Sequence, residues 1–137
     1  MHNLQVTEYN TMLDMAYKAM ENAYVPYSGF RVGACLQASS GQYFTGCNIE
    51  NASFSPTVCA ERTAIFKAIS EGERDFSGIA IVCSGTNYAY PCGVCRQVMN
   101  EFCHSSMPVI CGNNKREHVA LTLYDLLPYA FGPKDLI

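Results

Sequence analysis

The chain has 137 residues, 49% of them hydrophobic, and a formal net charge of −3 at pH 7. This length suits one domain, 1–137, with a real core, and the apolar content excludes intrinsic disorder. A surface that binds a polynucleotide usually carries a stripe of Lys and Arg, but these residues are few and scattered here. We therefore expect no nucleic-acid partner. No stretch approaches a membrane span, and residues 1–6 lack the features of a signal peptide, so we expect a cytoplasmic protein.

The first part of the chain predicts a helix followed by a β-hairpin. Apolar residues recur at helical spacing from residue 7, and Pro26 ends this pattern. A strand is then expected over 31–38, and Ser39-Ser40-Gly41 is typical of the turn into a second strand over 42–47.

The rest of the chain alternates helices with strands. Thr57 is the expected cap of a helix over 59–71, which stops at Gly72. The later elements are a buried strand over 79–83, a helix over 93–103, strands over 107–111 and 118–121, and a short helix over 123–127. The pattern predicts an α/β protein with a mixed sheet of about five strands and helices on its faces.

Two short clusters contain three of the eight cysteines: Cys59-Ala60-Glu61 and Pro91-Cys92-Gly93-Val94-Cys95. Three thiolates leave a tetrahedral Zn²⁺ one open position, which is the arrangement of a catalytic zinc. Both clusters start a predicted helix, where the backbone stabilises thiolates. The remaining cysteines are expected to be small buried hydrophobes without chemistry, namely Cys35, Cys47, Cys83, Cys103 and Cys111.

Two charged residues beside Cys59 have expected roles. Glu61 can sit next to the metal without binding it, where a proton shuttle belongs. Three thiolates leave the zinc centre with a net negative charge, which weakens the metal as a Lewis acid. Arg62 is the natural hydrogen-bond donor to compensate for that charge. Arg96, which follows Cys95, is expected to be structural.

The flanking residues make the pattern more specific. The motifs are Val25-Pro26-Tyr27-Ser28, Asn48-Ile49-Glu50-Asn51-Ala52, Cys59-Ala60-Glu61-Arg62-Thr63-Ala64, Pro91-Cys92-Gly93-Val94-Cys95-Arg96-Gln97 and Leu126-Leu127-Pro128. Together they resemble the small cytidine deaminases that act on free nucleosides. The resemblance implies a three-layer α/β/α sandwich with a mixed five-stranded sheet and one Zn²⁺ per chain. It also implies hydrolytic deamination of cytidine and 2′-deoxycytidine, with release of ammonia, in pyrimidine salvage.

The resemblance further implies a set of substrate contacts, namely Phe30, Asn48, Glu50, Ala52, Ala60 and Phe131. Asn48 and Glu50 would hold the ribose, and the backbones of Ala52 and Ala60 would bond the base. The two phenylalanines would lie against the nucleoside, with Phe131 supplied by a neighbouring subunit of a homotetramer. Phe54 stands where many relatives have Tyr, so any hydrogen bond from that hydroxyl is lost.

Three other interpretations remain open on the sequence alone. A deaminase of another cytosine nucleoside, such as blasticidin S, would share the three cysteines, although Asn48-Ile49-Glu50-Asn51 favours an ordinary ribose. A polynucleotide-editing deaminase or a nucleic-acid-binding module fits poorly with the acidic balance. A structural zinc domain would need a fourth ligand, which Cys47 or Cys83 could supply. The histidines match no ligand position and are expected to be ordinary residues: His2, His104 and His118.

Overall fold

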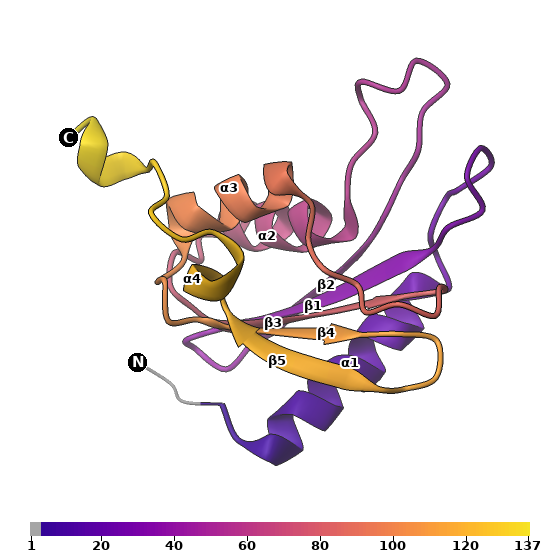
Figure 1. Ribbon diagram of the computed structural model, residues 1–137, viewed down its shortest axis with the longest axis horizontal. Coiled ribbons are helices and arrows are strands. Elements are labelled where there is room, and N and C mark those ends of the chain that lie inside the picture. Colours follow the sequence, from indigo (N-terminus) through magenta and orange to yellow (C-terminus); the bar gives the residue numbers. More distant parts are fainter. Residues whose placement is uncertain (1–3) are drawn as a thin grey trace.

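The computed structural model describes residues 4–137 and contains one five-stranded sheet in the order β2-β1-β3-β4-β5 (Figure 1). The strands are β1 (Val32–Ala38), β2 (Tyr43–Cys47), β3 (Phe76–Cys83), β4 (Pro108–Gly112) and β5 (His118–Thr122). β3 and β4 pair in parallel, and the other neighbouring pairs are antiparallel. The sheet is therefore mixed, as the sequence predicts.

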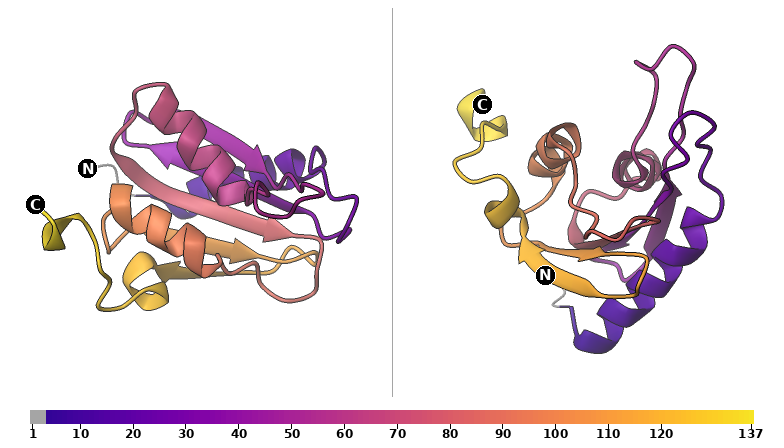
Figure 2. Two further views of the ribbon diagram at one scale, coloured as in Figure 1. Left: turned by 90° about the horizontal axis from the view of Figure 1, so that it is seen from above. Right: turned by 45° about the vertical axis from the view of Figure 1, so that its right-hand side comes forward.

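Helices cover both faces of the sheet (Figure 2). They are α1 (Val6–Met20), α2 (Ala60–Ser70), α3 (Gly93–Phe102) and α4 (Leu123–Leu126), followed by the short 3₁₀ helix η1 (Pro133–Asp135). α1 lies on one face, and α2 and α3 lie side by side on the other. This is the expected three-layer α/β/α arrangement. None of the helices described here is both long and apolar enough to cross a bilayer.

The central strands are apolar on both faces because each face packs against a helical layer. In β1, Ala34 and Leu36 belong to the core cluster that includes residues of α2 and α3, whereas Cys35 belongs to the cluster that includes residues of α1. Side chains alternate between the two faces of a strand, so this division is the expected result of a strand buried on both sides. Every residue of β3 is buried.

Close packing on β2 fixes the start of α2. A Cβ atom at Gly46 would lie only 2.6 Å from the carbonyl oxygen of Ala60 and 2.7 Å from the backbone nitrogen of Ala64. Only a glycine therefore lets the first turn of α2 rest directly on the strand. That first turn carries part of the cysteine cluster, so the contact positions the site described below.

The expected elements are all present, with small differences at their ends. β3 begins at Phe76, earlier than predicted, because the ladder with β1 extends to Ala38. The cap residue of α2 is Cys59 and not Thr57. The Thr57 hydroxyl instead accepts a hydrogen bond from the backbone N–H of Asn51 at 3.1 Å, so it stabilises the preceding loop.

Candidate functional site

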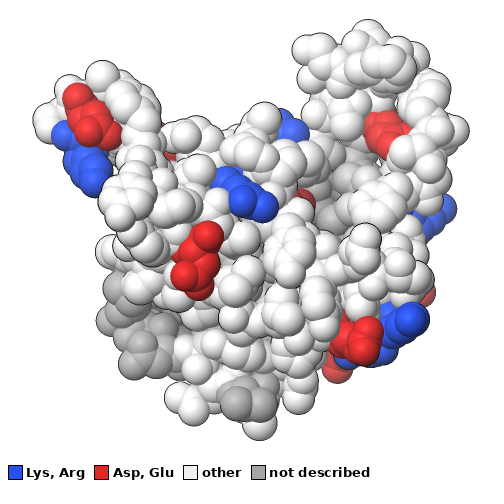
Figure 3. Space-filling model, in the orientation of Figure 1, with Lys and Arg blue, Asp and Glu red and all other residues white. Residues whose placement is uncertain are grey.

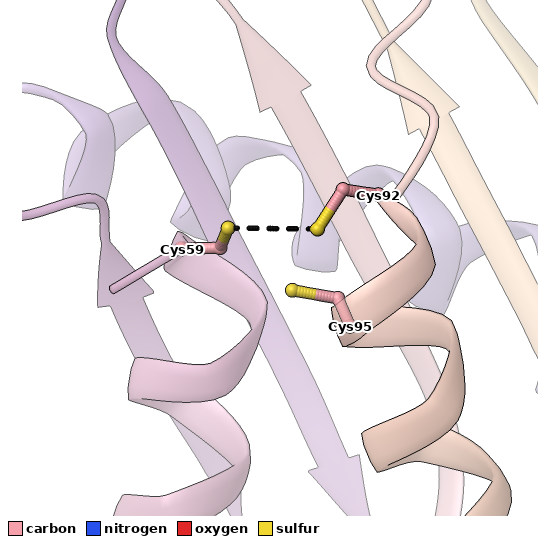
Figure 4. Close-up of side chains that lie close together, drawn as sticks. All are labelled: Cys59, Cys92 and Cys95. Carbon is pink, nitrogen blue, oxygen red and sulfur yellow. Dashed lines mark hydrogen bonds between the residues drawn. The ribbon is translucent and has the colours of Figure 1, made fainter. Parts of the chain in front are cut away.

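Three thiols meet between the starts of two helices (Figure 4). Cys59 caps α2, Cys92 caps α3, and Cys95 lies in the first turn of α3. Their sulfur atoms all lie within 4.8 Å of one another, and those of Cys59 and Cys92 are 3.8 Å apart. The cluster has only these three members within residues 4–137, so Cys47 and Cys83 do not supply a fourth ligand. A set of three soft sulfur donors suits zinc with an open position.

Hydrogen-bond donors around Cys59 favour its thiolate. A hydrogen bond from Cys95 is the largest influence that lowers the pKa of Cys59, to about 5, and it acts against the effect of burial. The Arg62 guanidinium adds a hydrogen bond from Nη2 to Sγ of Cys59 at 3.3 Å. Donation to Cys59 correspondingly raises the pKa of Cys95. Arg62 therefore lies where a cation can offset the charge of bound thiolates.

Glu61 lies in the first turn of α2 with a residue exposure of only 4%. Burial raises the pKa of its carboxyl group to about 7, against a lowering hydrogen bond from its own backbone N–H. The carboxylate is not a member of the metal-ligand cluster. A buried carboxyl group that titrates near neutrality can both accept and donate a proton, which is the property a general acid–base group needs.

Arg96 anchors the segment that precedes Cys92. Its Nε donates to the carbonyl oxygen of Pro91 at 2.6 Å, and its Nη1 donates to that of Leu126 at 2.7 Å. The residue before Cys92 is thereby tied to the end of α4. These contacts give Arg96 the structural role expected from the sequence.

Three of the residues expected to bind nucleoside share one hydrogen-bonded network. The Asn48 amide donates to the carbonyl oxygen of Phe30 at 2.8 Å and accepts from the N–H of Val32 at 2.9 Å. Glu50 accepts hydrogen bonds from the backbone of Tyr27 at 3.0 Å and from that of Ser28 at 3.2 Å. The loop before β1 and the strand end after β2 are thus joined by side chains.

A pocket of about 400 Å³ lies beside Glu50 and is lined by Tyr27, Ser28, Glu50, Asn51, Phe54 and Thr57. No Lys or Arg lines it. Phe54 is 74% exposed and has a positive φ of 63°, and its ring meets that of Tyr27 edge-on at 6.4 Å. Ala60 is buried at the start of α2, whereas Ala52 lies in an exposed turn.

Phe131 is held by α3 through its backbone. Its carbonyl oxygen accepts hydrogen bonds from the amides of Gln97 at 2.9 Å and Asn100 at 3.0 Å, and the residue is 60% exposed. In Figure 3, the C-terminal segment and the loops beside the start of α2 project on opposite sides of a hollow in the surface. Figures 1 and 2 show the C-terminal segment on the opposite side of the molecule from the loops that flank β1 and β2.

Neither of the two described histidines belongs to the cysteine cluster. At the surface, Nε2 of His104 lies 3.6 Å from Oδ1 of Asp75. His118 is an exposed residue of β5. His2 lies outside the described residues.

Sequence reasoning missed the contacts of three residues: Ser28 bonds Glu50, and Gln97 and Asn100 bond the backbone of Phe131. Ser28 belongs to a motif quoted above, but its pattern indicates only a turn. Gln97 and Asn100 look like ordinary polar residues of a helix surface. Nothing in the sequence links them to the C-terminal segment that they contact.

Comparisons with known proteins agree on one family. Residues 6–111 match the model of the cytidine and deoxycytidylate deaminase zinc-binding region. A cytidine deaminase of Sporosarcina psychrophila is 53% identical over 119 residues, which cover 87% of this chain and 88% of the relative.

Solved structures give the same result. The crystal structure of cytidine deaminase from Burkholderia pseudomallei has a TM-score of 0.86 and 43% identity, covering 89% of this chain and 98% of that one. The cytidine deaminase structure from Mycobacterium tuberculosis has a TM-score of 0.80 and 37% identity, covering 91% and 98%.

Proposed function

This chain belongs to the family of cytidine and deoxycytidylate deaminases, and we propose that its substrates are the free nucleosides cytidine and 2′-deoxycytidine. It is a zinc-dependent enzyme that hydrolyses the exocyclic amine of cytidine, giving uridine and ammonia. The observation that carries this function is the cluster of Cys59, Cys92 and Cys95 beside the buried carboxyl group of Glu61.

The proposed mechanism divides the work between the thiols and Glu61. The three cysteines would hold the zinc, and the bound metal would supply an activated water for the attack on C4 of the base. Glu61 takes a proton from the attacking water and delivers it to N3 of the ring, and it then transfers the remaining hydroxyl proton to the amino group, which leaves as ammonia. Arg62 offsets part of the negative charge of the thiolates through its hydrogen bond to Cys59.

Hydrogen-bonding capacity supports a sugar hydroxyl as the ligand of Asn48 and Glu50. The Asn48 amide uses one N–H on Phe30 and one lone pair on Val32, so one donor and one acceptor remain. Glu50 already accepts three hydrogen bonds. A hydroxyl group can donate to the remaining acceptor of Glu50 while it accepts from Asn48.

The charge beside the sugar site supports nucleosides over nucleotides. The family includes deoxycytidylate deaminases, whose substrate carries a phosphate. Here, the pocket beside Glu50 contains a carboxylate and no Lys or Arg. A phosphate needs cationic or backbone donors, and a nearby carboxylate repels it. We therefore expect dCMP to be a poor substrate.

The remaining substrate contacts are also part of the proposal. The backbones of Ala52 and Ala60 bond the base, Phe30 packs on the nucleoside, and Phe131 reaches the site of an adjacent chain in a homotetramer. The exposed side chain of Phe131, and the hollow between the C-terminal segment and the loops in Figure 3, support a site shared between chains. Exposed aromatic residues elsewhere on the chain also suit burial by neighbours, and they include Tyr24, Tyr27, Phe54, Tyr90 and Tyr129.

We place this single-domain enzyme, 1–137, in pyrimidine salvage in the cytoplasm. Its eight cysteines are all free thiols. Three of them must stay reduced to hold zinc, and a reducing compartment protects them.

Ammonia release from purified, zinc-loaded protein tests the proposal. The substrates are cytidine, 2′-deoxycytidine, cytosine, dCMP and blasticidin S, each at the same concentration. We expect turnover of the two nucleosides and little of the other compounds. Turnover of blasticidin S alone would replace the nucleoside assignment, and efficient turnover of dCMP would refute the argument from charge.

A further inference from the structure

The Ser28 hydroxyl joins two of the residues assigned to nucleoside binding. Its oxygen accepts a hydrogen bond from the backbone N–H of Phe30 at 3.0 Å. Its proton is donated to Oε2 of Glu50 in a short hydrogen bond. The carbonyl oxygen of Phe30 is in turn bonded by the Asn48 amide. Ser28 is therefore the link that connects Glu50 to the backbone of Phe30.

We infer that Ser28 is a positioning residue for substrate binding, which fixes the orientation of the Glu50 carboxylate toward the sugar. The inference rests on the proposed function, because it takes Glu50 as a sugar contact. Ser28 itself need not touch the nucleoside.

The number of donors around Glu50 explains why the hydroxyl matters. Both backbone donors, from Tyr27 and Ser28, bind Oε1, whereas the Ser28 hydroxyl is the donor on Oε2. With only Oε1 held, the carboxylate can rotate about that anchor. The hydroxyl therefore fixes the plane of the carboxylate and directs the remaining lone pair of Oε2. A fixed acceptor binds a hydroxyl without a further loss of side-chain freedom.

The same hydrogen bond favours the ionised form of Glu50. Donation from the Ser28 side chain is the largest influence on the pKa of Glu50 and lowers it. An ionised carboxylate only accepts hydrogen bonds, which suits a sugar hydroxyl that donates. The hydrogen bond that orients the carboxylate therefore also stabilises its charge.

The test compares three variants. Ser28→Ala removes the hydroxyl, Ser28→Thr keeps one, and Ser53→Ala is the matched control. Ser53 lies in the neighbouring loop and donates its hydroxyl to Asn51 at 2.8 Å, without a contact to Glu50. We expect Ser28→Ala to raise KM for cytidine about tenfold, because the freed carboxylate must then be ordered when the substrate binds, with kcat within about threefold of wild type. Ser28→Thr should restore KM, and Ser53→Ala should leave it unchanged.

A double-mutant cycle tests whether Ser28 acts through Glu50. In a Glu50→Ala background, Ser28→Ala should add less than about a twofold further rise in KM, because the group that it orients is absent. The inference would be overturned if KM of the double variant rose by the product of the two single-variant factors. A Ser28→Ala variant with a lower kcat and an unchanged KM would overturn it as well. Equal zinc content in all variants excludes damage to the metal centre. Wild-type protein without ammonia release would refute the proposed function, whereas active wild type with a normal Ser28→Ala variant would refute this inference alone.

Discussion

Gly46→Ala should damage the active site by forcing the start of α2 away from β2. The new Cβ would lie 2.6 Å from the carbonyl oxygen of Ala60, whereas ordinary contacts begin at 3.4 Å, so β2 and the start of α2 must separate by about 0.8 Å. It would also crowd the backbone nitrogen of Ala64 at 2.7 Å. Both obstacles are backbone atoms, which cannot rotate away. The whole first turn of α2 must therefore shift, together with Cys59 and Glu61.

The size of the effect follows from that displacement. Overpacking of this kind costs about 1–3 kcal/mol in the free energy of unfolding. For a chain of this length the melting temperature should fall by roughly 3–12 °C. A misplacement of about 1 Å in a catalytic site can reduce the rate about 100-fold. We therefore expect a loss of similar size in kcat/KM for cytidine.

The assay measures kcat/KM, zinc content and melting temperature of Gly46→Ala beside Gly93→Ala. Gly93 is the first residue of α3, next to Cys92, and a Cβ there meets nothing within 4 Å. The control should resemble wild type in all three measurements. Full zinc content, kcat/KM within threefold of wild type and an unchanged melting temperature in Gly46→Ala would refute the packing argument.

Three further changes test the site directly. Cys92→Ala should lose zinc and activity together because two thiols remain, and stoichiometric zinc in that variant would contradict the ligand assignment. Glu61→Gln should keep zinc but lower kcat by roughly 10²–10⁴ or more, since an amide cannot shuttle protons, whereas near-normal ammonia release would remove Glu61 from the mechanism. Phe131→Ala should raise KM with zinc retained, and light scattering should show wild type as a tetramer. A fully active monomer would rule out the shared site.

The fold could be predicted in its elements but not in its sheet order. Helical spacing before Pro26 and the apolar run over 79–83 are local patterns, and each produced the expected element. The order β2-β1-β3-β4-β5 depends on pairings between distant strands, which no local pattern encodes. The cap of α2 was wrongly predicted at Thr57 because its side chain bonds Asn51, across a loop whose path the sequence does not reveal.

In the candidate site, too, local patterns could be predicted from the sequence, whereas contacts between distant segments could not. The three thiols could be predicted because spacing places each one at a helix start, and the structure brings them together. Arg62 could be proposed from its position next to Glu61, and it donates to Cys59. The hydrogen bond from Ser28 to Glu50 could not be predicted, because the two residues lie in different segments that meet only in the folded chain.

The two halves of the site are therefore held by different means. Cys59 and Glu61 lie at the start of a helix whose position is set by contact with Gly46 of the sheet. Glu50 lies outside any strand or helix and is oriented by hydrogen bonds from another loop. Changes in sheet packing should consequently appear in zinc content and kcat, because they move the groups that we propose do the chemistry. Changes in the loops should appear in KM, because they loosen the groups that we propose hold the sugar while the metal centre stays in place.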